Sequence, residues 1–433
     1  MKLRSSITTL RGHPIIAAND DTTRQDASRL VAVLFGALLV FLPAAAHAEA
    51  FIPAHDTQVL DRVPPRNSNP LDASVARLRG QLNSNPADFT VANTLAQKHL
   101  ERFRRDGDPR DLGQAEAVIS PWLKQKSPPA LALLLRASIR QSNHQFDLAL
   151  ADLNAVMAQK PGDAEALLMR ASILQVQARY ADAKTSCGGL VMQDPAIAGI
   201  CLANVMMVSG QPQQGVAFLQ RFSAQVPNEH GIGAWAWASL GEAAAWQGQD
   251  ALAESTLRNG LKDSPQDAYL KTAWADFLIA HQRGAEAARL LANDTRNDNL
   301  LLRLALAEKQ TRASSLSDHI ADLNARFAAA ADRGDRVHLR EEAMFRLSLL
   351  NQPEAALKLA QVNWQVQKEV ADAHILLASA AAAKQPAAAQ PALQWLAQSG
   401  LQQPALLALQ QQLQRSPKAH AAVTVAANQQ AKP

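Results

Sequence analysis

The nine residues LLLRASIRQ at positions 133–141 recur as LLMRASILQ at positions 167–175, 34 residues further along the chain. The correspondence continues downstream at the same offset, where Ala149 aligns with Ala183. A period of this length is typical of a repeated helix pair, and a single pair cannot bury its own apolar face. Such pairs stack on their neighbours and share one continuous core. We therefore expect an all-α fold, an α-solenoid of stacked antiparallel helix pairs.

Small residues recur at one position of each expected helix, where they allow two helices to approach closely. On the first helices these are Ala137, Ala171, Ala203, Gly241 and Ala275, and on the second helices Ala149, Ala183, Gly215, Ala253 and Ala287. A proline is expected to end each second helix, because proline cannot continue a helix. These prolines are Pro161, Pro195, Pro227 and Pro265.

The pattern resembles the tetratricopeptide repeat family, whose repeat carries W-x2-L-G-x2-Y followed by A-x3-F and P. Trp237, Leu240 and Gly241 match the first half of that signature. The resemblance is strong over residues 130–293 and weaker over 71–126 and 294–412. In the last region we expect helices at 300–312, 317–331, 337–351, 353–367, 370–384 and 387–412. The resemblance implies a superhelix with a concave groove that binds a protein or peptide, and it brings no catalytic residues.

In this family the groove is lined by fixed positions of the first helices. Carried over to this chain, the resemblance implies groove residues Asn204, Met207, Trp235, Glu242, Trp246, Tyr269 and Asp276. The three aromatic side chains are the best candidate anchors for a partner, because large aromatic groups often dominate interface energies. For Trp235 and Trp246 the alternative is packing between repeats. The positions lack the Lys/Arg set that clamps a C-terminal carboxylate in chaperone adaptors.

The N-terminal segment has the pattern of an export signal. A region containing several basic residues precedes the apolar run Leu30–Leu42, and Ala46-His47-Ala48 provides an A-x-A cleavage site. We interpret residues 1–48 as a signal peptide, removed after Ala48, and expect a periplasmic or secreted protein without membrane insertion. An uncleaved anchor or a core helix is the alternative. Residues 49–70 are expected to be a linker, and residues 413–433 a disordered tail.

The chain has two cysteines, Cys187 and Cys201. Each lies seven residues from Asp194, near which the chain turns between two helices, so antiparallel packing would bring the two thiols level. In an oxidising compartment they could form a disulfide. The alternative is a pair of small buried apolar side chains.

Composition and motifs give no support for catalysis, a cofactor or a metal. Over 433 residues, 43 Lys and Arg oppose 39 Asp and Glu, a balance that does not favour nucleic acid. The nearest metal-like pattern, His338 with Glu341 and Glu342, is interpreted as a solvated charged face with Arg340 and Arg346 as ion-pair partners. The acidic stretch Asp106–Asp111 is interpreted as a turn that ends in an Asp helix cap rather than as a calcium loop.

The leading functional hypothesis is therefore a non-catalytic periplasmic scaffold that holds a protein or peptide in its groove. A second hypothesis is a regulatory subunit of an envelope export or assembly complex. A third is an all-α enzyme, which would need a cluster of titratable groups in one cavity.

Overall fold

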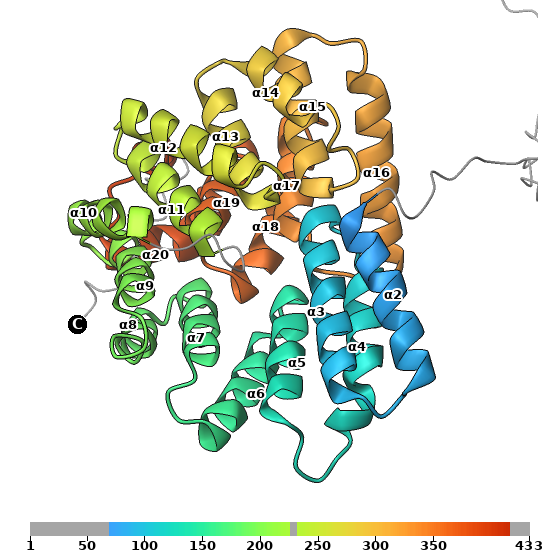
Figure 1. Ribbon diagram of the computed structural model, residues 1–433. Coiled ribbons are helices and arrows are strands. Elements are labelled where there is room, and N and C mark those ends of the chain that lie inside the picture. The colour runs from blue at the N-terminus through green and yellow to red at the C-terminus, as the bar shows by residue number, and fades with distance from the viewer. Residues whose placement is uncertain (1–68, 226–231, 416–433) are drawn as a thin grey trace, which may run out of the picture. The chain divides into compact units, whose positions relative to one another are not determined.

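The computed structural model of the chain describes residues 69–225 and 232–415 (Figure 1). Throughout these two ranges the regular secondary structure is helical, which confirms the all-α fold. The expected signal peptide, the linker up to residue 68 and the tail from residue 416 lie outside the described residues. None of the described helices has the length and apolar character needed to cross a bilayer.

The helices follow one another as antiparallel pairs. The N-terminal helices are α2 (Pro70–Ser84), α3 (Phe89–Asp106) and α4 (Arg110–Leu123). The central repeats pair α5 (Ala130–Ser142) with α6 (Phe146–Gln159), α7 (Ala164–Val176) with α8 (Tyr180–Gly188), α9 (Pro195–Met207) with α10 (Pro212–Phe222), α11 (Ile232–Trp246) with α12 (Asp250–Asp263), and α13 (Ala268–Ala280) with α14 (Gly284–Leu291). The C-terminal helices are α15 (Asp298–Thr311), α16 (Leu316–Asp332), α17 (Leu339–Ser348), α18 (Pro353–Val366), α19 (Val370–Ala382), α20 (Gln390–Ser399) and α21 (Pro404–Gln414).

One expected boundary is wrong. The helix predicted over 387–412 is divided into α20 and α21, because Gly400 adopts a left-handed φ of 64° and Pro404 opens the next helix. Glycine at this position ends a helix without steric cost.

Three of the first helices, α7, α9 and α13, begin at a side-chain cap. Asp163, Asp194 and Asp267 each accept hydrogen bonds from backbone N–H groups one or two residues inside the helix that follows. A carboxylate at this position satisfies donors that have no partner within the helix. The sequence predicted that Pro195 ends the second helix α8. Pro195 instead opens α9, because Asp194 caps α9 and proline fits the first helical position.

The small residues of the repeat lie where two helices cross. All of the alanines and glycines predicted for this role are buried. A Cβ added to Gly241 would lie 2.4 Å from Leu257 Cγ of the paired helix. At Gly215 the added Cβ would lie 2.9 Å from the backbone oxygen of Ala203, which cannot rotate away. These distances show that the small residues of the repeat lie where the two paired helices are in close contact.

Replacing Gly241 with alanine is expected to lower the free energy of unfolding by about 1–3 kcal/mol, because the new methyl group overpacks the contact with Leu257. The matched control is Gly80→Ala in α2, where nothing lies within 4 Å of the added Cβ. There alanine should stabilise the helix by up to about 1 kcal/mol. Urea titration of both variants provides the measurement. Equal effects at both positions would show that Gly241 is not at a close helix crossing.

The two cysteines form a disulfide between α8 and α9, with their Cα atoms 5.5 Å apart. Both side chains lie in the core, since Cys187 is 0% and Cys201 4% exposed. The bridge therefore joins the second helix of one repeat to the first helix of the next, as the expected antiparallel geometry allows.

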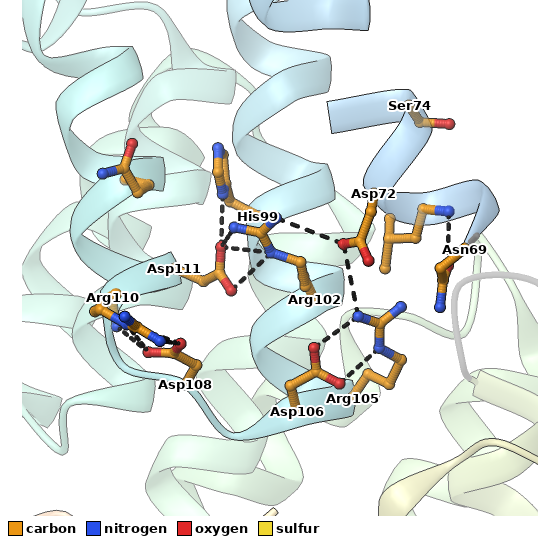
Figure 2. Close-up of polar contacts among 12 residues, drawn as sticks. Asn69, Asp72, Ser74, His99, Arg102, Arg105, Asp106, Asp108, Arg110 and Asp111 are labelled. Atoms are coloured by element: carbon orange, nitrogen blue, oxygen red, sulfur yellow. Dashed lines mark hydrogen bonds and ion pairs between the residues drawn. The ribbon is translucent and has the colours of Figure 1, made fainter. Parts of the chain in front are cut away.

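A buried polar cluster joins α3 to α4, and Figure 2 shows Asp111 between His99 and Arg102. His99 Nδ1 lies 2.7 Å from Asp111 Oδ1, and Arg102 Nε donates to Asp111 Oδ2 at 2.9 Å. Burial lowers the pKa of His99 despite its contact with Asp111. The prediction of an Asp helix cap is wrong, because Asp111 lies inside α4 and neutralises Arg102, while Pro109 occupies the cap position.

The C-terminal helices pack back onto the central repeats, a contact that simple stacking does not predict. Side chains of α17–α21 share one apolar cluster with residues of α9, α10 and α11, and Figure 1 shows red α19 and α20 beside green α9–α11. Trp395 of α20 donates a hydrogen bond from Nε1 to Tyr180 Oη at 2.7 Å. The first helices of the central repeats thus bury part of their free surface within the chain.

Candidate binding site

Two adjoining cavities lie between the first helices of the central repeats and the connection from α18 to α19. The larger has a volume of about 310 Å³ and is lined by α7, α9, α11, the start of α13 and Glu369. The smaller has a volume of about 70 Å³ and extends from there toward Trp246 and Val370. Gln175, Asn204, Tyr269 and Glu369 line both.

Most of the candidate residues that the repeat register predicts lie on the walls of these cavities. Trp235 lines the larger cavity, and Asn204 and Tyr269 line both; Met207, Glu242 and Trp246 line the smaller. Asp276 does not line either cavity. It lies two helical turns beyond Tyr269 on α13 and forms an ion pair with Arg303, whose Nε is 3.0 Å from Asp276 Oδ1.

The two tryptophans pack between helices and also line a cavity, which are the two roles that the sequence analysis left open. Trp235 and Trp246 are half-buried, and each packs against an apolar cluster of the core. Each also contributes to a cavity wall. Packing between helices and exposure to a ligand are therefore compatible for both rings.

A short segment, Gln367–Glu369, crosses the inner surface between α18 and α19, and we call it the crossing segment. The backbone N–H of Lys368 donates to the carbonyl of Val176 at 2.8 Å. The Gln367 amide nitrogen lies 2.7 Å from Nδ1 of His144. Burial lowers the pKa of His144 to about 4, which keeps its ring neutral. No sequence pattern indicated this segment, because no repeat position marks a contact between residues about 200 positions apart.

An ion network anchored by Arg340 of α17 holds the crossing segment. The Arg340 guanidinium donates to Glu369 at 2.8 Å, to Glu341 at 3.1 Å and to Asp372 at 3.3 Å. Asp372 also accepts from the amide of Asn363 at 2.7 Å and from the backbone N–H of Glu369 at 2.9 Å. A single guanidinium is thus shared by three carboxylates, one on α17, one on α19 and one on the crossing segment.

The interpretation of residues 338–342 as a solvated charged face is wrong for Arg340 and Glu341. Glu341 is 3% exposed, and although burial raises its pKa, Arg340, His338 and Arg303 outweigh burial and lower it to about 2. Burial acts to lower the pKa of Arg340, but Glu341, Asp372 and Glu369 raise it well above its usual value.

A second pair of titratable groups lies at the cavity wall. Tyr269 Oη donates a hydrogen bond to Glu242 Oε2 at 2.7 Å. Burial raises the pKa of Glu242 to about 7, and burial together with the carboxylate of Glu242 raises the pKa of Tyr269 well above 10. Tyr269 itself is 51% exposed and lines both cavities.

This arrangement provides recognition groups in the form of rings, amides and carboxylates. Among the described residues, no group of three His, Cys, Asp or Glu side chains is placed to hold a metal ion. The acid with a pKa near neutrality, Glu242, has a tyrosine hydroxyl as its bonded partner, and that hydroxyl stays protonated. These groups can hold a ligand by ring contacts, hydrogen bonds and charge.

No protein-family model matches the chain, and no curated protein matches it in sequence. Among solved structures, it is similar to a tetratricopeptide repeat protein from Parabacteroides merdae ATCC 43184, with 17% identity and a TM-score of 0.42 over 55% of this chain and 92% of that chain. It is also similar to a chain of the APC/C hetero-tetramer Cut9–Hcn1, with 13% identity and a TM-score of 0.48 over 79% of this chain and 66% of that chain. The tetratricopeptide-like fold of the central repeats follows from their 34-residue period and helix-pair geometry.

Proposed function

We propose that this chain is a non-catalytic binding scaffold that is exported to the periplasm and holds a protein or peptide segment on its inner surface. The observation that carries the proposal is the convergence of residues from three successive repeats on the two cavities. Asn204 and Met207 come from α9, Glu242 and Trp246 from α11, and Tyr269 from α13. Repeats that present adjacent first helices in this way make an extended recognition surface.

The crossing segment restricts what the inner surface can accept. The backbone N–H of Lys368 donates a hydrogen bond to the carbonyl of Val176, so the crossing segment lies against the end of α7. A cavity of about 310 Å³ is at the lower end of the range for ligand sites. A whole helix does not fit in this space. The partner is therefore expected to insert a short extended segment or a chain end, with the rest of its surface outside.

The mature protein is expected to begin at Glu49, and immobilised protein is expected to capture a partner from a periplasmic extract. N-terminal sequencing tests the first point and mass spectrometry of the captured material tests the second. Soluble client peptides support the scaffold, whereas an inner- or outer-membrane complex supports the regulatory-subunit alternative. A retained Leu30–Leu42 segment in the membrane fraction would contradict the proposed location.

The same capture is expected to weaken by about 2 kcal/mol for Trp246→Ala, the loss typical of an aromatic anchor. Phe218→Ala in α10 is the control, because Phe218 is an exposed aromatic residue that does not line either cavity. Melting temperatures of both variants separate lost binding from lost packing. A lower melting temperature with unchanged affinity for Trp246→Ala would assign that ring to the core alone.

A further inference from the structure

The charged groups on the cavity walls are mostly acidic. Glu242, Asp267 and Glu369 line the two cavities, and Lys368 is the basic residue among the lining side chains. Asp276 lies beyond the wall and is already paired with Arg303. A concave surface with more carboxylates than cations favours a positively charged ligand, because its protein walls screen the charges less than bulk water does.

The Arg340 guanidinium, which donates to Glu369, does not remove this excess. Arg340 is shared by Glu341, Glu369 and Asp372, so one guanidinium faces three carboxylates. The side chain of Glu369 keeps 41% of its surface exposed and lines both cavities. Burial raises the pKa of Asp372 to about 6 and that of Glu242 to about 7, and the neighbouring carboxylate of Glu369 acts on both in the same direction.

Aromatic rings stand next to these carboxylates. Trp235 and Tyr269 line the larger cavity, and Tyr180 and Trp246 line the smaller. The face of such a ring attracts a cation that has left water, and tryptophan does so best. The combination of aromatic walls with carboxylates suits an organic ammonium group, whose alkyl part contacts the rings while its N–H groups meet oxygen acceptors.

We propose that these adjoining cavities bind an alkylammonium group, whose alkyl part lies in the larger cavity between Trp235 and Tyr269. Its ammonium end reaches Glu369, which lines both cavities, and Glu242 of the smaller cavity, and these two carboxylates are its counter-charges. The peptide source of that group, a lysine side chain or an amino terminus, rests on the proposed scaffold function. A free amine presents the same chemistry. A butylammonium group has five heavy atoms and takes roughly 150 Å³ if each occupies about the volume of one water, which fits within a cavity of about 310 Å³.

Binding of an ammonium group and protonation of Glu242 oppose each other. The charged groups that act on Glu242 are Asp276 of α13, Glu369 of the crossing segment and Arg340 of α17, and the neutral Tyr269 hydroxyl is bonded to it. Lys368 lines the same cavity. Since the ligand prefers the ionised carboxylate, its affinity should rise as the pH rises through about 7. The lysine ammonium of the ligand stays charged over this range, so the change reports the protein.

The test is calorimetric titration of the full mature protein with the end-blocked peptide Ala-Lys-Ala, with its norleucine analogue and with cadaverine, at pH 6 and pH 8. We expect the lysine peptide to bind at least 10-fold more tightly than the norleucine peptide, and more tightly at pH 8. Glu242→Gln should weaken binding at least 5-fold and remove most of the pH dependence. It keeps an acceptor for the Tyr269 hydroxyl. Glu354→Gln, at an exposed position of α18, is the matched control and should change neither.

Each outcome decides between the proposals. Binding of cadaverine without the lysine peptide supports the ammonium site and counts against a peptide as its source. Equal binding of the lysine and norleucine peptides overturns the ammonium site and leaves the scaffold function in place. If neither the amine nor the lysine peptide binds, the ammonium site is overturned, and capture from periplasm still decides the scaffold function separately.

Discussion

Replacing Arg340 with methionine is expected to lower the free energy of unfolding by about 3 kcal/mol, because it leaves three carboxylates without their shared counter-ion. Methionine preserves most of the side-chain length, so the change removes charge and hydrogen bonds more than volume. Glu341 and Asp372 are 3% and 1% exposed, so water cannot replace the lost guanidinium without disrupting the packing around them. Chemical denaturation at pH 7.5 provides the measurement.

The control is Arg346→Met on the same helix. Arg346 contacts Glu342 at 3.0 Å one turn away, a local pair of the kind that usually contributes less than 1 kcal/mol. A comparable loss in both variants would show that the Arg340 network has no special role.

The crossing segment should also loosen in Arg340→Met. Its Lys368 amide donates to Val176, and Glu369 beside it is held by Arg340. Hydrogen exchange at the Lys368 amide should therefore become faster in Arg340→Met and stay unchanged in Arg346→Met. Unchanged protection in both would mean that the segment is held by its backbone contacts alone.

Removal of the disulfide is expected to have an effect of similar size. The cysteines are 14 residues apart in sequence, and closing a loop of this length in the unfolded chain corresponds to about 3 kcal/mol of stability. The double variant Cys187→Ala, Cys201→Ala should lose this amount in urea titration. Reduction of the wild-type protein should lower its stability by a similar amount.

Thiol labelling separates the bridge from simple packing. Unfolded protein that has not been reduced should show no reactive thiol, and a reductant should change the stability of the wild type but not of the double variant. Two labelled thiols in the unreduced protein would leave the cysteines as small buried side chains, and the variant would then report only the lost volume.

Much of the fold could be predicted from local patterns. The 34-residue period placed the helix pairs, and the small residues such as Gly241 and Ala183 identified the close crossings that the structure contains. The same register placed Asn204, Glu242 and Tyr269 near one another, because equivalent positions of successive first helices face the same side of a solenoid. These features depend on interactions within one repeat or between neighbours.

Other features could not be predicted because they depend on where the solenoid brings distant segments. The contact of Lys368 with Val176 and that of Trp395 with Tyr180 join residues about 200 positions apart. Arg340 looked like an ordinary surface charge in its own helix, and its burial depends on Glu369 and Asp372 of a later one. The sequence by itself determined the repeat and the face that each first helix presents. Only the tertiary structure decided that the C-terminal helices return to that face, because the small rotations between repeats add up along the chain and no single repeat records their sum.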